Sequence, residues 1–163
     1  MCETPASPSG IDAAAAPAED AALARAEAVL AQVADTIGRF RYLFATESAL
    51  RDQMAARLAR PAWVIAVERR YGVRNRVDIE VTAEGVRVAI EVKTAGSLGA
   101  AVMQCERYAA LPEVDAVLLV SAAPWAGGAA ARSWRRLGGV VDGRGGETDG
   151  KPFRVLRAAA RFF

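Results

Sequence analysis

Two adjacent segments that alternate apolar and polar side chains constrain the fold of this chain most strongly. They cover residues 76–82 and 86–94, and residues 83–85, which include Gly85, link them. One set of alternate positions is apolar: Val77, Ile79, Val81, Val86, Val88, Ile90 and Val92. The other set is mostly charged: Arg76, Asp78, Glu80, Arg87, Ala89, Glu91 and Lys93. Successive side chains of a strand point to opposite faces, and a short link joins antiparallel neighbours. The pattern therefore predicts an antiparallel hairpin with one apolar face and one charged face.

The rest of the chain predicts helices and strands around this hairpin. We expect helices over residues 18–38, 46–59 (Thr46 as N-cap, Pro61 beyond the end), 98–110 and 129–137, and strands over 63–71, 114–122 and 152–159. Residues 114–122 are almost continuously apolar, which is typical of a strand buried on both faces. Residues 138–150 are expected to form a loop. The predicted fold class is therefore mixed α/β, with the order helix, strand, strand, strand, helix, strand.

Domain boundaries follow from composition. Residues 1–17 are rich in Ala, Pro and Ser and are expected to be a disordered tail. Residues 18–44 are expected to be a helix and linker, and residues 45–163 the main domain. No apolar run approaches the roughly 20 residues that cross a membrane, and the N-terminus does not resemble a signal peptide. A cytoplasmic protein is the expectation.

The absence of histidine limits the chemistry that this chain can perform. The sequence has no histidine, and its two cysteines are Cys2 and Cys105. A Ser-His-Asp triad, a Cys-His pair and an ordinary zinc site are therefore excluded within this chain. Carboxylates remain as ligands, and they favour Mg²⁺ or Mn²⁺.

Arginine is concentrated in clusters. The net charge is +2, but the first twenty residues carry four acidic residues and no basic one, so residues 21–163 carry 21 − 15 = +6. The clusters comprise Arg57, Arg60, Arg69, Arg70, Arg74 and Arg76, then Arg132, Arg135 and Arg136, and later Arg154, Arg157 and Arg161. Such clusters are suited to bind a phosphate backbone. A GC-rich genome, which encodes Arg in place of Lys, explains any single arginine equally well. Against that bias, Lys93 and Lys151 are the chain's two lysines.

The charged face of the hairpin has the composition of a metal site. Asp78 and Glu91 lie on adjacent predicted strands, and Lys93 follows Glu91 on the same face, roughly 6.6 Å further along. Two carboxylates and an ammonium group are suited to hold a divalent cation and a water beside a phosphate. Mg²⁺ needs few protein ligands because it retains its waters.

These residues resemble the PD-(D/E)XK nuclease superfamily, whose pattern is an aspartate, a variable gap and then (D/E)xK across a β-hairpin. Asp78 followed by Glu91-Val92-Lys93 fits that pattern, and Val77 stands where the eponymous proline would be. Glu47 on the second predicted helix corresponds to an acidic residue often found before the sheet. Gln104 and Tyr108, four residues apart on the following helix, resemble the RecB-like and resolvase-like branches. The resemblance covers roughly residues 45–122.

The resemblance implies a restriction-endonuclease-like core (αβββαβ), in which helices flank a mixed central sheet, and a Mg²⁺- or Mn²⁺-dependent deoxyribonuclease whose partner is DNA. Asp78 and Glu91 would bind the metal with the carbonyl of Val92, and Lys93 would orient or deprotonate the attacking water. Glu47 would bind a second metal or hold a metal-bound water. Gln104 would orient a water or contact DNA, and Tyr108 would support it.

Other interpretations stay open on the sequence. The charged residues could form cross-strand salt bridges on a solvent-facing sheet, Glu80 is a rival ligand, and Glu47 could simply favour a helix N-terminus. Three tryptophans are expected to be packing residues: Trp63, Trp125 and Trp134. The chain could also be a catalytically inactive nuclease-fold module that binds nucleic acid or protein, or an α/β interaction domain. A homodimer or a larger complex could be needed to grip a duplex.

Overall fold

A computed structural model describes residues 16–130, 136–137 and 150–162. In chain order the elements are α1 (Ala16–Gly38), β1 (Arg41–Phe44), α2 (Glu47–Leu58), β2 (Val64–Tyr71), β3 (Asn75–Ala83), β4 (Val86–Lys93), α3 (Leu98–Ala109), β5 (Ala116–Ser121), α4 (Trp125–Ala130), β6 (Arg136–Leu137), β7 (Lys151–Arg157) and β8 (Ala159–Phe162). The predicted α/β class is confirmed. None of the helices in the described ranges is long and apolar enough to cross a membrane.

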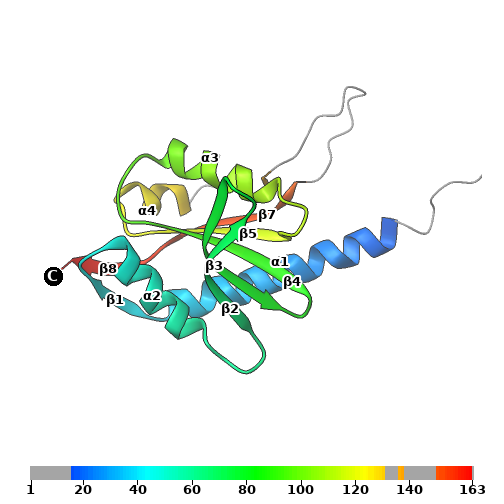
Figure 1. Cartoon of the computed structure of the whole chain (residues 1–163), viewed down its shortest axis with the longest axis horizontal. Coiled ribbons are helices and arrows are strands. Elements are labelled where there is room, and N and C mark those ends of the chain that lie inside the picture. Colours follow the sequence, from blue (N-terminus) through cyan, green and yellow to red (C-terminus); the bar gives the residue numbers. More distant parts are fainter. Residues whose placement is uncertain (1–15, 131–135, 138–149, 163) are drawn as a thin grey trace, which may run out of the picture.

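The main sheet is mixed and has the strand order β2-β3-β4-β5-β7-β6. Strands β2, β3 and β4 form an antiparallel meander, as the alternating pattern predicts. Strand β5 then pairs parallel to β4, and β7 pairs parallel to β5. A parallel neighbour requires a crossover, which α3 provides between β4 and β5. Figure 1 shows α3 and α4 on one side of the sheet and α1 and α2 on the other.

Two hydrophobic clusters hold the helices to the two faces of the sheet. The α1–α2 core joins these helices to one face and includes Val29, Leu30, Val33, Ile37, Leu50, Met54, Leu58, Ile79, Val81, Val88, Ile90, Val92 and Leu118. The α3 core lies on the other face and includes Val77, Ala89, Val102, Cys105, Tyr108, Val117, Leu119 and Phe153. Strand β5 is buried along its whole length, as its continuous apolar sequence predicts.

Local sequence signals account for the starts of α2 and α3. The side chain of Thr46 accepts a hydrogen bond from the Ala49 N–H at 3.1 Å, so Thr46 is the N-cap of α2 as predicted. Ser97 caps α3 in the same way through Ala100. The predicted helix over residues 18–38 begins slightly earlier, at Ala16. Residues 1–15 of the predicted disordered tail lie outside the described residues.

Several predictions need correction. The predicted helix over residues 129–137 is wrong in extent, because α4 ends at Ala130 and residues 136–137 form a strand that pairs with the start of β7. The predicted last strand over residues 152–159 is two strands, β7 and β8, separated at Ala158. The linker before residue 45 contains β1, which pairs parallel to β8. The predicted loop over residues 138–150 lies outside the described residues except for Gly150.

Val77 faces the opposite way from the prediction. It belongs to the α3 core, whereas Ile79 and Val81 belong to the α1–α2 core. The change of face coincides with a break in the pairing of β3. The β2–β3 register includes neither Glu68 nor Asp78, and Glu68 has φ 54. The register of β3 with β4 ends at Ile79 and Ile90.

Candidate functional site

A pocket of about 250 Å³ opens where β3, β4 and α3 meet the start of α2. It is lined by every side chain to which the sequence assigns a role in the site: Glu47, Asp78, Glu91, Lys93, Gln104 and Tyr108. These residues come from four elements, α2, β3, β4 and α3, of which α2 is the one distant along the chain. The remaining predicted metal ligand, the carbonyl of Val92, belongs to the backbone between Glu91 and Lys93.

Asp78 bridges β3 and β4 at the point where their register ends. Its Oδ2 accepts the N–H of Val92 at 2.9 Å, so the carboxylate takes the place of a strand carbonyl for this buried donor. Burial raises the pKa of Asp78, and the hydrogen bond from Val92 and the charge of Lys93 act against that rise. The side chain is therefore held across the two strands by a backbone contact.

Glu91 is completely buried at the floor of the pocket. Its Oε2 accepts a hydrogen bond from the hydroxyl of Tyr108 at 2.9 Å. Its Oε1 is paired with the Lys93 ammonium nitrogen at 2.5 Å. Burial and the charge of Asp78 raise the pKa of Glu91 to about 7, although Lys93 and Tyr108 lower it. A buried carboxylate next to a second carboxylate is costly unless a cation compensates it.

Lys93 lies between two acidic side chains. Its ammonium nitrogen is 2.5 Å from Glu91 Oε1 and 4.0 Å from Glu47 Oε1. Burial lowers the pKa of Lys93. Three nearby carboxylates outweigh this effect and raise the pKa above its ordinary value: Glu91, through its hydrogen bond and its charge, and then Glu47 and Asp78 through their charges. The side chain therefore remains a cation at neutral pH in the metal-free protein.

Glu47 reaches the site from the first turn of α2. Its Oε2 accepts hydrogen bonds from the N–H and the hydroxyl of Thr94, at 2.9 and 3.2 Å. The side chain thereby ties the N-terminus of α2 to the chain just beyond β4. Its other oxygen, Oε1, faces Lys93, so Glu47 lies beside the two deeper carboxylates with Lys93 between.

Gln104 and Tyr108 share one face of α3, as their spacing predicts. Gln104 Nε2 donates a hydrogen bond to the Tyr108 hydroxyl at 2.7 Å. That hydroxyl lies 2.6 Å from the Arg76 carbonyl and 2.9 Å from Glu91 Oε2, and its single proton serves one of these acceptors at a time. Gln104 therefore acts on Glu91 through Tyr108. Burial, with the charge of Glu91, raises the pKa of Tyr108, so this hydroxyl stays protonated.

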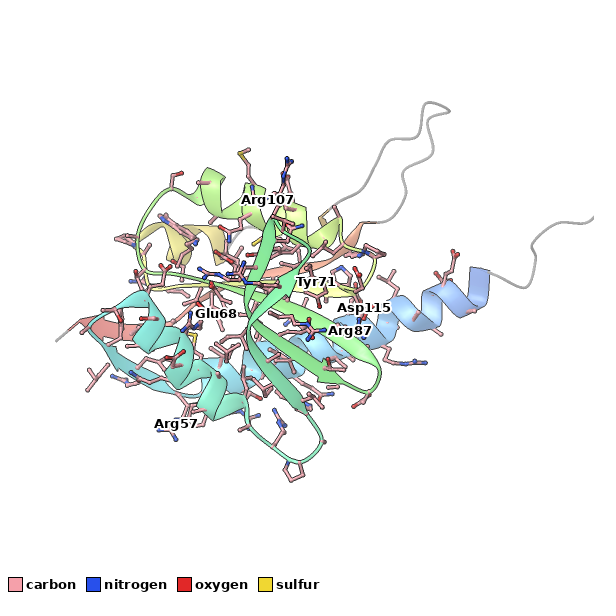
Figure 2. The ribbon with its side chains drawn as sticks, in the orientation of Figure 1. Arg57, Glu68, Tyr71, Arg87, Arg107 and Asp115 are labelled. Carbon is pink, nitrogen blue, oxygen red and sulfur yellow. The ribbon has the colours of Figure 1, made fainter. Side chains whose placement is uncertain are left out.

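Four further residues line the pocket: Arg74, Asn75, Arg76 and Arg107. Arg74 and Arg76 belong to an arginine cluster noted in the sequence. Arg107 was not singled out, although its position three residues after Gln104 places it near the same face of α3. The turn between β2 and β3 lies next to α3 in Figure 1, and Figure 2 labels Arg107 on that helix.

The structure also decides between the alternative roles that the sequence left open for Glu80, the charged face of the hairpin and the tryptophans. Glu80 does not line the pocket; it is buried and accepts a hydrogen bond from the Tyr71 hydroxyl. Glu91 is buried beneath α3, so the charged face is not a solvent-facing sheet. Trp63 is buried and stacks with Arg60, and Trp125 packs on the α3 core, so both are packing residues as predicted. Trp134 lies outside the described residues.

The donor set fits a hydrated hard cation and not a metal enclosed by protein. Among the described residues, no three side chains of His, Cys, Asp or Glu are grouped so that they could hold one metal ion together. Asp78 and Glu91 nevertheless share the pocket, and the buried Oε1 of Glu91 has a cation, Lys93, beside it. Mg²⁺ is commonly held by one or two carboxylates and keeps several waters. The two carboxylates are sufficient for such an ion.

Comparison of the chain with models of protein families, with curated proteins and with solved structures finds no match.

Proposed function

We propose that this protein is a metal-dependent nuclease that hydrolyses DNA phosphodiester bonds. One observation carries the proposal: two carboxylates from adjacent strands, Asp78 and Glu91, share a pocket with the ammonium group of Lys93. Perturbed pKa values concentrate at functional sites, and Glu91 combines full burial with a pKa of about 7. A merely structural ion pair has no need of the second carboxylate, which raises that pKa further.

The order of the elements also supports the proposal. Helix α2, the meander β2–β3–β4, helix α3 and the parallel strand β5 follow one another in the order αβββαβ. This is the order that the resemblance to the PD-(D/E)XK superfamily implies. The motif residues also lie where that resemblance expects them, on β3, on β4 and on the flanking helices. We therefore propose a restriction-endonuclease-like core over roughly residues 45–122.

The roles of the site residues follow from their contacts. Asp78 and Glu91, with the carbonyl of Val92, would hold Mg²⁺ or Mn²⁺. Such an ion would polarise the phosphate and stabilise the charge that develops on it. Lys93 presents a cation beside Glu91 and would orient the attacking water. Tyr108 is a positioning residue, since its hydroxyl holds Oε2 of Glu91 while Oε1 lies against Lys93.

Two of the expected roles change in this proposal. Gln104 donates its hydrogen bond to Tyr108, so we assign it to the support of that tyrosine before any contact with water or DNA. Glu47 is engaged by Thr94 through one oxygen and faces Lys93 with the other. We therefore assign Glu47 to the orientation of Lys93 or of a metal-bound water.

A second function has one observation in its favour. Lys93 lies 2.5 Å from Glu91 and so compensates its charge without any metal. A module that binds nucleic acid and does not cleave it would also use such an arrangement. If the protein is a nuclease, substitution of Glu91 abolishes DNA cleavage. If it is a binding module, the same substitution leaves DNA binding unchanged.

The test is DNA cleavage in the presence of Mg²⁺ or Mn²⁺. We expect nicked or shortened DNA from the wild-type protein, and a loss of about 100-fold or more in Glu91→Ala and Lys93→Ala proteins that remain folded by circular dichroism. Glu80→Gln is the matched control, because Glu80 is also a buried carboxylate of the same hairpin but lies outside the pocket. Cleavage that persists in both Glu91→Ala and Lys93→Ala would refute a nuclease site here. DNA binding without cleavage in the wild type would favour the second function.

A further inference from the structure

Two arginines that line the pocket have no counter-ion among the residues that the structure describes. Arg74 lies in the turn between β2 and β3, Arg107 lies in the last turn of α3, and both are exposed. In the described part of the chain, neither side chain forms an ion pair or a side-chain hydrogen bond. The third arginine of the pocket, Arg76, differs because it lies 3.5 Å from Glu68.

Without the arginines, the charged side chains that line the pocket carry a net negative charge. Glu47, Asp78 and Glu91 contribute −3 when ionised and Lys93 contributes +1, which sums to −2. One divalent cation at the two deeper carboxylates would bring that sum to zero. Arg74 and Arg107 are then additional positive charges at the mouth of a small pocket, where like charges repel and an anion is attracted.

The local backbone fixes where these arginines stand. Gly72 has φ 64 and begins the turn that leads to Arg74, and a side chain there would be strained. Beyond the turn, the carbonyl of Arg76 lies 2.6 Å from the Tyr108 hydroxyl, which fastens β3 to α3. The end of the β2–β3 hairpin and the end of α3 are thereby held together at the pocket. Arg74 and Arg107 approach it from these two elements.

We propose that Arg74 and Arg107 bind the phosphate next to the one that is cleaved. The inference rests on the proposed nuclease function and extends it to the class of substrate. The substrate is a nucleotide chain held at consecutive phosphates, and neither a phosphomonoester nor a mononucleotide satisfies the site. Guanidinium groups suit this role because they bind phosphate oxygens through paired N–H groups in a fixed plane.

The first test measures binding independently of catalysis. A fluorescein-labelled thymidine oligonucleotide is titrated with protein in Ca²⁺ at several NaCl concentrations, and binding is followed by fluorescence anisotropy. Each lost phosphate contact should reduce the slope of log K against log [NaCl] by about 0.7 for a single strand. We expect about that reduction in Arg74→Gln and in Arg107→Gln, and about twice it in the double variant. Arg39→Gln is the matched control, because Arg39 is exposed and does not line the pocket.

The second test identifies the phosphate. Cleavage is compared between an oligonucleotide with ordinary linkages and versions in which an uncharged methylphosphonate replaces one linkage on either side of the cleaved bond. In the wild type, one of these replacements should lower kcat/KM by about tenfold or more, the range for a charged hydrogen bond. In the Arg74→Gln, Arg107→Gln double variant, the same replacement should cause no further loss.

The outcomes separate this inference from the proposed function. Cleavage and salt dependence that are both unchanged in the arginine variants would overturn the inference and leave the nuclease function standing. If the wild type binds the oligonucleotide but never cleaves it, the nuclease function fails, and the salt slopes still decide whether Arg74 and Arg107 contact phosphate. If the wild type does not bind the oligonucleotide at all, both fail.

Discussion

The buried carboxylate of Glu91 should make the metal-free protein less stable as the pH rises. The ordinary pKa of a glutamate is 4.5, whereas burial and Asp78 raise that of Glu91 to about 7. The folded state therefore holds this proton more tightly than the unfolded state does. The contribution of Glu91 to stability is fully present below pH 4.5 and is lost as the pH rises through about 7. At about 1.36 kcal/mol for each pH unit, this interval corresponds to about 3 kcal/mol.

The substitution Glu91→Gln isolates that contribution. Glutamine has nearly the same shape, keeps an oxygen for the Tyr108 hydroxyl and cannot ionise. The attraction of Lys93 is already included in the pKa of about 7, so it does not need to be subtracted again. We expect the variant and the wild type to be about equally stable near pH 4.5. We expect the metal-free variant to be more stable by about 3 kcal/mol at about pH 8, while it loses cleavage activity.

Urea unfolding followed by tryptophan fluorescence measures this difference. Both proteins are unfolded in EDTA at several pH values from about 4.5 to about 8, and the free energies of unfolding are compared at each pH. Added Mg²⁺ should then stabilise the wild type and leave the variant unchanged, because a ligand of the folded state shifts unfolding by mass action. Free energies of the two proteins that stay parallel within about 0.5 kcal/mol over this range would refute the reasoning, since the usual uncertainty of extrapolation is of that order.

Three further predictions concern the support of the site. Tyr108→Phe removes the hydrogen bond that lowers the pKa of Glu91, so the pH profile of kcat/KM should move to higher pH, and an unchanged profile would contradict the role given to this hydroxyl. Leu118→Ala empties a completely buried position on β5 and should cost about 2–5 kcal/mol in urea unfolding, whereas a loss below about 1 kcal/mol would argue against the packing of β5. Thr46→Ala removes the side-chain cap on the Ala49 N–H and should cost about 1 kcal/mol in thermal unfolding, and an equal Tm would show that the cap contributes nothing.

The grouping of the site residues was predictable because it depends on short-range periodicity. Alternation along residues 76–82 and 86–94 places Asp78 and Glu91 on adjacent strands, and helical spacing places Gln104 and Tyr108 on one face of α3. The structure brings these residues into one pocket. The cap at Thr46 is equally local and was also predicted.

The features that the sequence did not predict depend on contacts between distant segments. Strand β1 exists because β8 pairs with it, and β6 exists because β7 does. Alternation alone also placed Val77 on the wrong face, since it assumes a regular strand. The pairing of β2 and β3 is irregular at Glu68 of β2, which has a left-handed backbone, and at Asp78 of β3, whose side chain accepts the Val92 N–H. Arg107 was missed because only the approach of the β2–β3 turn to α3 makes it part of the pocket.

The central claim is that Asp78 and Glu91 together hold one divalent cation. The most direct test is a crystal of the wild-type protein soaked in Mn²⁺ and measured for anomalous scattering. The account predicts a single strong anomalous peak between these two carboxylates, at about 2.0–2.2 Å from an oxygen of each, and no such peak in a Glu91→Gln crystal. A wild-type crystal that shows no peak in this pocket, with Lys93 still against Glu91 at saturating Mn²⁺, would contradict it.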